Sequence, residues 1–251
     1  DNNSVVISNG GLVKAGQVTI GRLGSASNNS IVVTGTGSQL QGVGTSAAEI
    51  VVGNVGISGT GNSIQVLDGG IVNSVKGMSV NVGKLALNNG TVDLTFNDPI
   101  FGKTTDETLT IGSAGIIEVT GGATASTIRA KSLVGLAGAI VDLQSTGQAS
   151  TLNASFSDAA GWNNTNITLQ MSIRNLSDGV QVGDFSQLNI AGIATTGIFN
   201  YGGALTIDLT NYIAPVSPVS LKLIGWDSTT GTSSNLTVSF INGTALSTSI
   251  L

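Results

Sequence analysis

Short apolar strands that end in glycine recur along the first half of the chain, and this repetition constrains the fold more than any other feature. The first such element spans residues 5–11 (VVISNGG), and looser copies follow at 30–37, 63–70, 84–90 and 115–122. A second element has two aliphatic residues around one other residue and then a glycine, at 18–21, 50–53, 80–83 and 109–112. A period of roughly 30 residues is typical of stacked repeats.

A strand of about four residues cannot bury an apolar face by itself, but stacked strands can enclose a continuous core. Glycine or asparagine would then lie wherever a turn needs a positive φ. No aromatic residue occurs before Phe96, which suits a narrow interior lined by Val, Ile, Leu and Ala. Residues 1–145 are therefore predicted to form a parallel β-helix, or β-solenoid. A Gly-rich antiparallel sandwich with similar turns is the alternative.

The second half contains longer strands in which apolar and polar residues alternate strictly. Such strands are predicted at residues 167–174, 205–210, 219–223 and 236–240. Period-2 alternation is typical of half-buried antiparallel strands. Both tryptophans, Trp162 and Trp226, lie in this half and would suit a sandwich core or a cap. We therefore predict an all-β protein with a solenoid over residues 1–145 and an antiparallel, sandwich-like region or cap over 146–251.

The alternation of the two repeated elements resembles the β-solenoid repeats of autotransporter passenger domains and of bacterial PEP-CTERM surface proteins. The resemblance covers residues 1–125, and its motifs specify architecture far better than activity. It implies a secreted or cell-surface β-helix. Neither the outer-membrane barrel nor the Pro-Glu-Pro sorting tail of these families is found in the sequence, so the resemblance specifies no export route.

Charged side chains are scarce, at 9% of residues against about 25% in an ordinary soluble domain. A surface of hydroxyls and amides lacks the charged gatekeepers that normally stop sheet edges from pairing with other chains. This composition favours a self-associating protein outside the cytoplasm. The nine Lys and Arg residues are scattered and the net charge is −5, so no basic patch for nucleic acid is expected.

The chain has no histidine and no cysteine. This composition excludes a Ser-His-Asp triad, an H-E-x-x-H zinc site, a thiol nucleophile and a disulfide scaffold. The acids Asp68, Asp93 and Glu118 are scattered along the repeats, which does not indicate the clustered carboxylates of a β-helical polysaccharide lyase or hydrolase. We therefore expect no enzyme, and a lyase-like β-helix is kept as a further alternative.

One acidic loop is the candidate for a cation. Asp98, Asp106 and Glu107 could supply oxygen ligands to Ca²⁺ from one loop. Their spacing matches no calcium motif, and acidic loop residues are commonly only solvated. No other cofactor is expected.

The chain begins with Asp1 and no leader follows, which fits a mature product or a trimmed chain. Its longest apolar stretch, residues 133–141, is much shorter than the roughly 20 residues of a membrane-spanning helix. We therefore expect an extracellular or cell-surface protein, without a membrane span, whose signal peptide has been removed.

Strand-like sequence lies at both ends of the chain, at Val5, Val6 and Ile7 and again at Leu246, Ile250 and Leu251. We predict that subunits join head to tail by strand addition through these segments. The expected function is a self-assembling unit of a cell-surface layer or filament. The alternative is an adhesin or surface-exposed domain that binds glycans or proteins.

Many Asn-x-Ser/Thr triplets occur because the chain is rich in these residues. The candidates for glycosylation in the second half are Asn153, Asn163, Asn166, Asn235 and Asn242.

Overall fold

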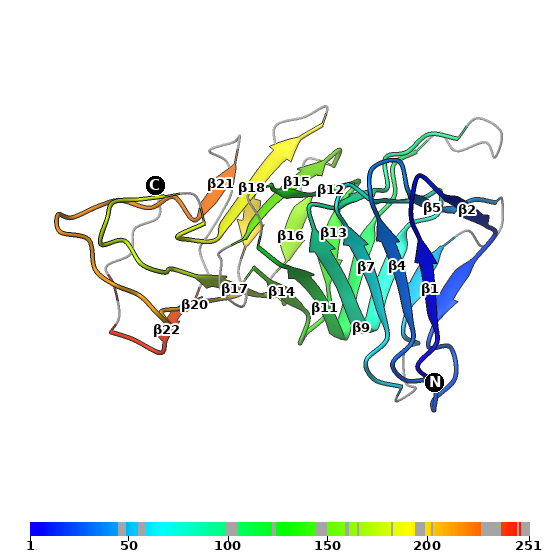
Figure 1. The fold of residues 1–251 in the computed structure, drawn as a ribbon, viewed down its shortest axis with the longest axis horizontal. Coiled ribbons are helices and arrows are strands. Elements are labelled where there is room, and N and C mark those ends of the chain that lie inside the picture. The colour runs from blue at the N-terminus through cyan, green and yellow to red at the C-terminus, as the bar shows by residue number, and fades with distance from the viewer. Residues whose placement is uncertain are drawn as a thin grey trace.

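A computed structural model describes residues 1–44, 49–54, 59–98, 105–121, 124–143, 150–158, 161–164, 166–181, 183–193, 199–201, 203–226, 237–244 and 246. Over these residues the protein is all-β, without a helix, and its strands form two sheets that are built from parallel pairs. Figure 1 shows the strands stacked along the long axis of the molecule, from β1 at one end to β22 at the other.

The larger sheet has 14 strands. Its main path runs, in order, through β1 (Ser4–Ile7), β4 (Ser30–Thr34), β7 (Ser63–Leu67), β9 (Met78–Asn88), β11 (Leu109–Val119), β14 (Ile140–Asp142), β17 (Thr168–Ser172), β20 (Ala204–Asp208) and β22 (Thr237–Ile241). The remaining strands of this sheet are β3 (Val18–Ile20), β6 (Ile50–Val52), β13 (Leu133–Gly135), β16 (Trp162–Asn164) and β19 (Phe199–Tyr201).

The smaller sheet has eight strands. They are, in order, β2 (Leu12–Ala15), β5 (Gln39–Gly42), β8 (Ile71–Ser74), β10 (Thr91–Asp93), β12 (Ser126–Ala130), β15 (Thr151–Phe156), β18 (Gln187–Gly192) and β21 (Ile224–Trp226).

The chain passes alternately through the two sheets, and we call one such passage a coil. β1 of the first coil pairs with β4 of the second, while β2 pairs with β5 in the other sheet. Strands of one coil are therefore bonded to strands of the next coil, although the chain between them visits the other sheet. This is how strands too short to be stable alone form a continuous sheet.

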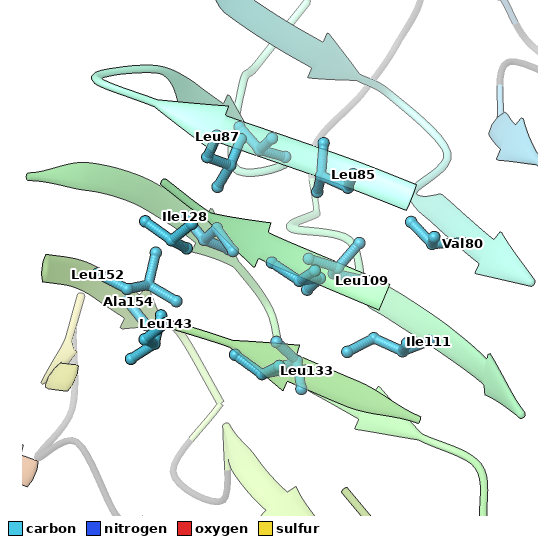
Figure 2. Close-up of a cluster of buried hydrophobic side chains, with 14 of the residues drawn as sticks. Val80, Leu85, Leu87, Leu109, Ile111, Ile128, Leu133, Leu143, Leu152 and Ala154 are labelled. Carbon is cyan, nitrogen blue, oxygen red and sulfur yellow. The ribbon is translucent and has the colours of Figure 1, made fainter. Parts of the chain in front are cut away.

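In-register stacking creates columns of apolar side chains, nearly all aliphatic, that run through the molecule. One column crosses the larger sheet through Val5, Ile31, Ile64, Leu85, Ile117, Val141, Leu169, Leu205 and Val238. Another crosses the smaller sheet through Val13, Leu40, Val72, Val92, Ile128, Ala154, Ile190 and Trp226. Figure 2 shows side chains of the two sheets, such as Leu85 and Ile128, meeting in one interior.

Left-handed backbone follows several strands of the larger sheet at equivalent places. Asn9, Asp68 and Asn89 follow β1, β7 and β9 with φ values of 55°, 52° and 54°. Asn242 directly follows β22 with a φ of 59°. Asparagine and aspartate tolerate this region better than other side chains, which explains why they recur after the apolar strands.

The prediction of antiparallel strands for residues 146–251 is wrong for the strand ladders that the structure describes. β15, β18 and β21 pair in parallel, and so do β17, β20 and β22. Within the described part of this half, antiparallel pairing is found at an isolated bridge between Ile173 and Phe185. Period-2 alternation reports one buried and one solvated face, and a parallel strand at the wall of a core satisfies it equally well.

The boundary predicted near residue 145 is crossed by both sheets. β12 pairs with β15 and β14 pairs with β17, so the same two ladders continue into the second half. The division into two regions therefore stays a prediction. The strand expected at 219–223 is not formed, and this segment follows Pro215 and Pro218, which lack the N–H that a sheet requires.

Candidate functional site

The first coil leaves one end of the core open. In the described strand order β1 and β2 each have a neighbour on one side only, β4 and β5 respectively. Val5 and Val6 in β1 are 51% and 62% exposed, and Leu12 in β2 is 53% exposed. Ile64, which lies two coils further along the column of Val5, is 0% exposed. The high exposure of Val5 thus reflects a missing neighbour in the stack.

The opposite end of the stack is formed by β22 in the larger sheet and β21 in the smaller sheet. Val238 and Phe240 in β22 are half-buried and pack against the core, as does Trp226 in β21. The next residue after Phe240, Ile241, is 41% exposed. Among the described strands, β1 and β22 therefore end the larger sheet with a neighbour on one side only, and both carry apolar side chains that are exposed or half-buried.

An asparagine ladder sets the register of the first coils. Asn3 donates from its backbone N–H and its Nδ2 to Oδ1 of Asn29, at 3.2 and 3.0 Å. Asn29 repeats both bonds to Oδ1 of Asn62, at 3.1 and 3.0 Å, and Nδ2 of Asn62 donates to the carbonyl oxygen of Ala26. Asn62 is fully buried. A slip of one residue would break all of these bonds, so the ladder fixes the pairing of β1, β4 and β7.

A polar anchor holds the end of the C-terminal edge strand. Oδ1 of Asp208, the last residue of β20, accepts hydrogen bonds from Nδ2 of Asn242 at 2.8 Å and from the N–H and Oγ1 of Thr210. Burial, the largest single influence, raises the pKa of Asp208. The hydrogen bonds from Asn242 and Thr210, with the positive charge of Arg174, outweigh it and hold the pKa below its usual value of 3.8. The ionised carboxylate is therefore the form that fastens Asn242.

We expect acid to weaken this anchor. Because the folded-state pKa is depressed, Asp208 contributes stability above its ordinary pKa and loses that contribution as the pH falls through the folded value. The melting temperature of Asp208→Asn should therefore lie below that of the unmodified protein at pH 7, and the gap should close toward pH 3. Thermal unfolding at a series of pH values measures the gap. A gap that stays constant with pH would contradict the role of the charge.

The predicted assembly residues fall differently on the structure. Val5 and Val6 lie exposed on the edge strand β1, whereas Ile7 is buried, at 4% exposure. Leu246 packs against the core, and Ile250 and Leu251 lie outside the described residues. The sequence interpretation missed that β22 is the last described strand of the larger sheet. The repeated Asn-Gly after β1 and β22 was the signal that could have revealed it.

The predicted calcium ligands do not gather into a metal site. Asp98 is buried, at 5% exposure, while Asp106 and Glu107 are partly exposed. Across the described part of the chain, no group of three or more His, Cys, Asp or Glu side chains is placed to hold a metal ion. Calcium binding at this loop stays a prediction.

The other singled-out acids bind side chains of neighbouring coils or their own turn. Glu118 forms an ion pair with Lys84 at 2.8 Å, and Asp68 accepts a hydrogen bond from Thr34. Oδ1 of Asp93 accepts hydrogen bonds from the N–H and Oγ1 of Thr95, and its Oδ2 lies 3.7 Å from a guanidinium nitrogen of Arg129. These contacts link successive coils or close a turn, so each acid has a structural role.

The glycosylation candidates differ in their surroundings. Oδ1 of Asn153 in β15 accepts from Nδ2 of Asn189 at 3.0 Å, and Asn242 donates its Nδ2 to Asp208. Asn166 is exposed, Asn163 lies in β16, and Asn235 lies outside the described residues. The amide nitrogen that a glycan would occupy is thus already a hydrogen-bond donor at Asn242.

No family model, curated protein or solved structure matches this chain. Among the residues that the structure describes, no helix is long and apolar enough to span a membrane.

Proposed function

We propose that the chain is a β-solenoid with a structural function, as a self-assembling subunit of an extracellular layer or filament. The observation that carries the proposal is the pair of unprotected strand edges at opposite ends of the stack. At the first coil Val5 is 51% exposed, whereas the members of the same column from Ile64 to Leu205 are at most 5% exposed. A second copy is a partner that can bury both ends by the contacts that already hold the coils together.

The composition of the edges supports this proposal. The six described strands with a neighbour on one side only, β1, β2, β3, β19, β21 and β22, contain one charged residue, Lys14. Soluble proteins normally protect exposed edges with charges, prolines, bulges or a covering segment. Edges with so little protection pair readily with other strands, which favours a protein whose role is to associate. The scarcity of charge in the whole chain agrees with an extracellular location.

No catalytic role is proposed. The acids that a β-helical hydrolase would require are used in contacts between coils or within turns, as for Glu118 with Lys84 and Asp68 with Thr34. A structural protein needs only a stiff stack and ends that join.

Self-assembly can be tested with the purified protein alone. Sedimentation velocity over a concentration series should show a mass that rises from the 25.0 kDa monomer to a distribution of multimers. Negative-stain electron microscopy of the same samples should show thin filaments whose width is that of one molecule. A single species of monomer mass at the highest concentrations would overturn the proposed function.

A second candidate function is adhesion through the segment between β20 and β21. Ile213, Val216 and Val219 in this segment are 52%, 93% and 42% exposed. Clustered apolar side chains on a surface commonly mark binding sites. A monomer that retains binding to cells or immobilised glycans, and loses it when Val216 is replaced by serine, would favour this candidate over assembly.

A further inference from the structure

We infer that β22 of one copy adds to β1 of the next copy, parallel and in the same register that the coils use within the chain. The larger sheet would then continue through the interface without interruption. The inference rests on the proposed function of self-assembly and names the strands and the register that carry it.

The two edge strands have matching sequences and turns. Residues 4–10 read Ser-Val-Val-Ile-Ser-Asn-Gly, and residues 237–243 read Thr-Val-Ser-Phe-Ile-Asn-Gly. Each begins with a hydroxyl residue and a valine and ends in Asn-Gly, with Asn9 and Asn242 in left-handed backbone at φ values of 55° and 59°. The next copy would therefore place one left-handed turn beside another, as happens between coils.

The columns of the core agree with this register. Val5 is the first and Val238 the last member of one column of in-register pairs through the larger sheet. When β1 of the next copy follows β22, its Val5 lies next to Val238 and continues that column. The exposed apolar surface of Val5, 51% in the single molecule, is then covered by an aliphatic neighbour like every other member.

The backbone N–H and C=O groups of β1 and β22 that face no described strand also lie at matching positions. In a parallel ladder, alternate residues of a strand bond to opposite neighbours. The carbonyl of Asn3 accepts from Ser30, so the odd residues of β1 face β4, and Ser4 and Val6 face the open edge. Thr237 donates to Gly203, so Val238 and Phe240 face the open edge of β22.

The same alternation of bonding residues is used where β1 pairs with β4 inside the chain. There the earlier strand uses the positions of Val5 and Ile7, and the later strand uses the positions equivalent to Ser4 and Val6. At the proposed interface the earlier strand is β22, with Val238 and Phe240 at the positions of Val5 and Ile7. The later strand is β1, with Ser4 and Val6. Donors and acceptors therefore meet without a shift of register.

The interface concerns the larger sheet. β22 begins a new coil, while the last described strand of the smaller sheet, β21, belongs to the coil before it. When β1 of the next copy pairs with β22, β2 of that copy is separated from β21 by the width of one strand and does not pair with it. We expect the direct ladder between copies at β22 and β1 only.

Engineered cysteines test the register directly, because the chain has no cysteine of its own. Val6 and Ser239 are exposed and occupy equivalent positions. In adjacent strands their Cα atoms would lie about 4.8 Å apart, which a disulfide of roughly 4.4–6.8 Å Cα separation can bridge. The double variant Val6→Cys/Ser239→Cys should form a ladder of covalent multimers on oxidation. A mixture of the two single variants should give covalent dimers only.

The matched control shifts one cysteine by two residues on the same face of the strand. In Val6→Cys/Thr237→Cys the Cα atoms of the paired positions would lie about 8 Å apart, beyond the reach of a disulfide. Its multimers should form at least tenfold more slowly. Equal rates for the two double variants, or rapid covalent dimers of Val6→Cys alone, would overturn the register. The second result would indicate two copies joined through their β1 edges.

Val6→Pro tests direction by removing a donor that faces the open edge and is not needed by β4. Proline is tolerated on edge strands in this position, so the melting temperature should stay within a few degrees of that of Val6→Ala. Val6→Pro alone should not polymerise, but it should shorten filaments of the unmodified protein in proportion to its fraction, because its β22 still binds. Filaments of unchanged length would overturn the proposed direction. An unmodified protein that never polymerises would instead overturn the function itself.

Discussion

Replacing Trp162 by alanine is expected to lower the free energy of unfolding by about 3–5 kcal/mol, the range measured for large aromatic side chains in cores. Trp162 is fully buried and is among the largest buried side chains of the protein. Its ring meets Phe156 edge to face, with centroids 6.3 Å apart and an interplanar angle of 68°. The substitution removes this contact and leaves a cavity between the sheets that short aliphatic neighbours cannot fill.

Urea unfolding followed by circular dichroism measures this loss. The matched control is Val216→Ala, because Val216 is 93% exposed and its truncation should change stability by no more than about 0.5 kcal/mol. If Trp162→Ala and Val216→Ala unfolded at similar urea concentrations, the ring would not be part of a packed core. Trp162→Phe, which keeps an aromatic ring, should recover part of the stability and so separate ring packing from general disruption.

The stacked parallel strands of the first half could be predicted from the sequence because each coil repeats the same short pattern of apolar residues followed by a turn residue. Residues 5–7, 31–33 and 64–66 are strand segments that begin and end with an aliphatic residue and are followed within three residues by Gly, Asn or Asp. The structure places these strands side by side as β1, β4 and β7. Repetition shows which distant segments pair, because equivalent segments of a repeat occupy equivalent places in the stack.

The direction of pairing in the second half could not be predicted in the same way. The alternation in residues 168–172 and 204–208 specifies which side chains are buried, and it is the same for parallel and antiparallel neighbours. The partner of β17 is β20, a strand reached only after the chain has crossed β18 in the other sheet. Without a clear repeat, nothing in these two segments identifies that connection.

The candidate site was predictable in part. An exposed N-terminal strand could be expected from the aliphatic residues at the start of the chain, and β1 is an edge strand. The asparagine ladder was missed, although an asparagine directly precedes the first serine of β1, β4 and β7, at residues 3, 29 and 62. Asparagine was interpreted as a residue of turns and sequons. Its use in a ladder depends on stacking of equivalent positions, which becomes visible only when the coils are aligned.

Gly53→Ala is expected to cost about 2–5 kcal/mol, from roughly 1–2 for left-handed backbone and about 1–3 for overpacking. Gly53 follows β6 with a φ of +70°, and a Cβ there would overlap the carbonyl oxygen of Val82 in the next coil. The backbone cannot move away easily, because the Gly53 N–H donates to Ile20 at 2.8 Å. Extra volume at this point would therefore push two stacked coils apart.

Gly10→Ala is the matched control for Gly53→Ala. Gly10 has a φ of +76°, but nothing lies within 4 Å of the position of its Cβ. It should therefore lose only the backbone contribution of about 1–2 kcal/mol. Urea unfolding of both variants separates the cost of the backbone from that of the close approach between coils. Equal losses of stability would mean that the two coils can separate at Gly53 at no cost in free energy. The close contact between Gly53 and Val82 would then not be present in the protein.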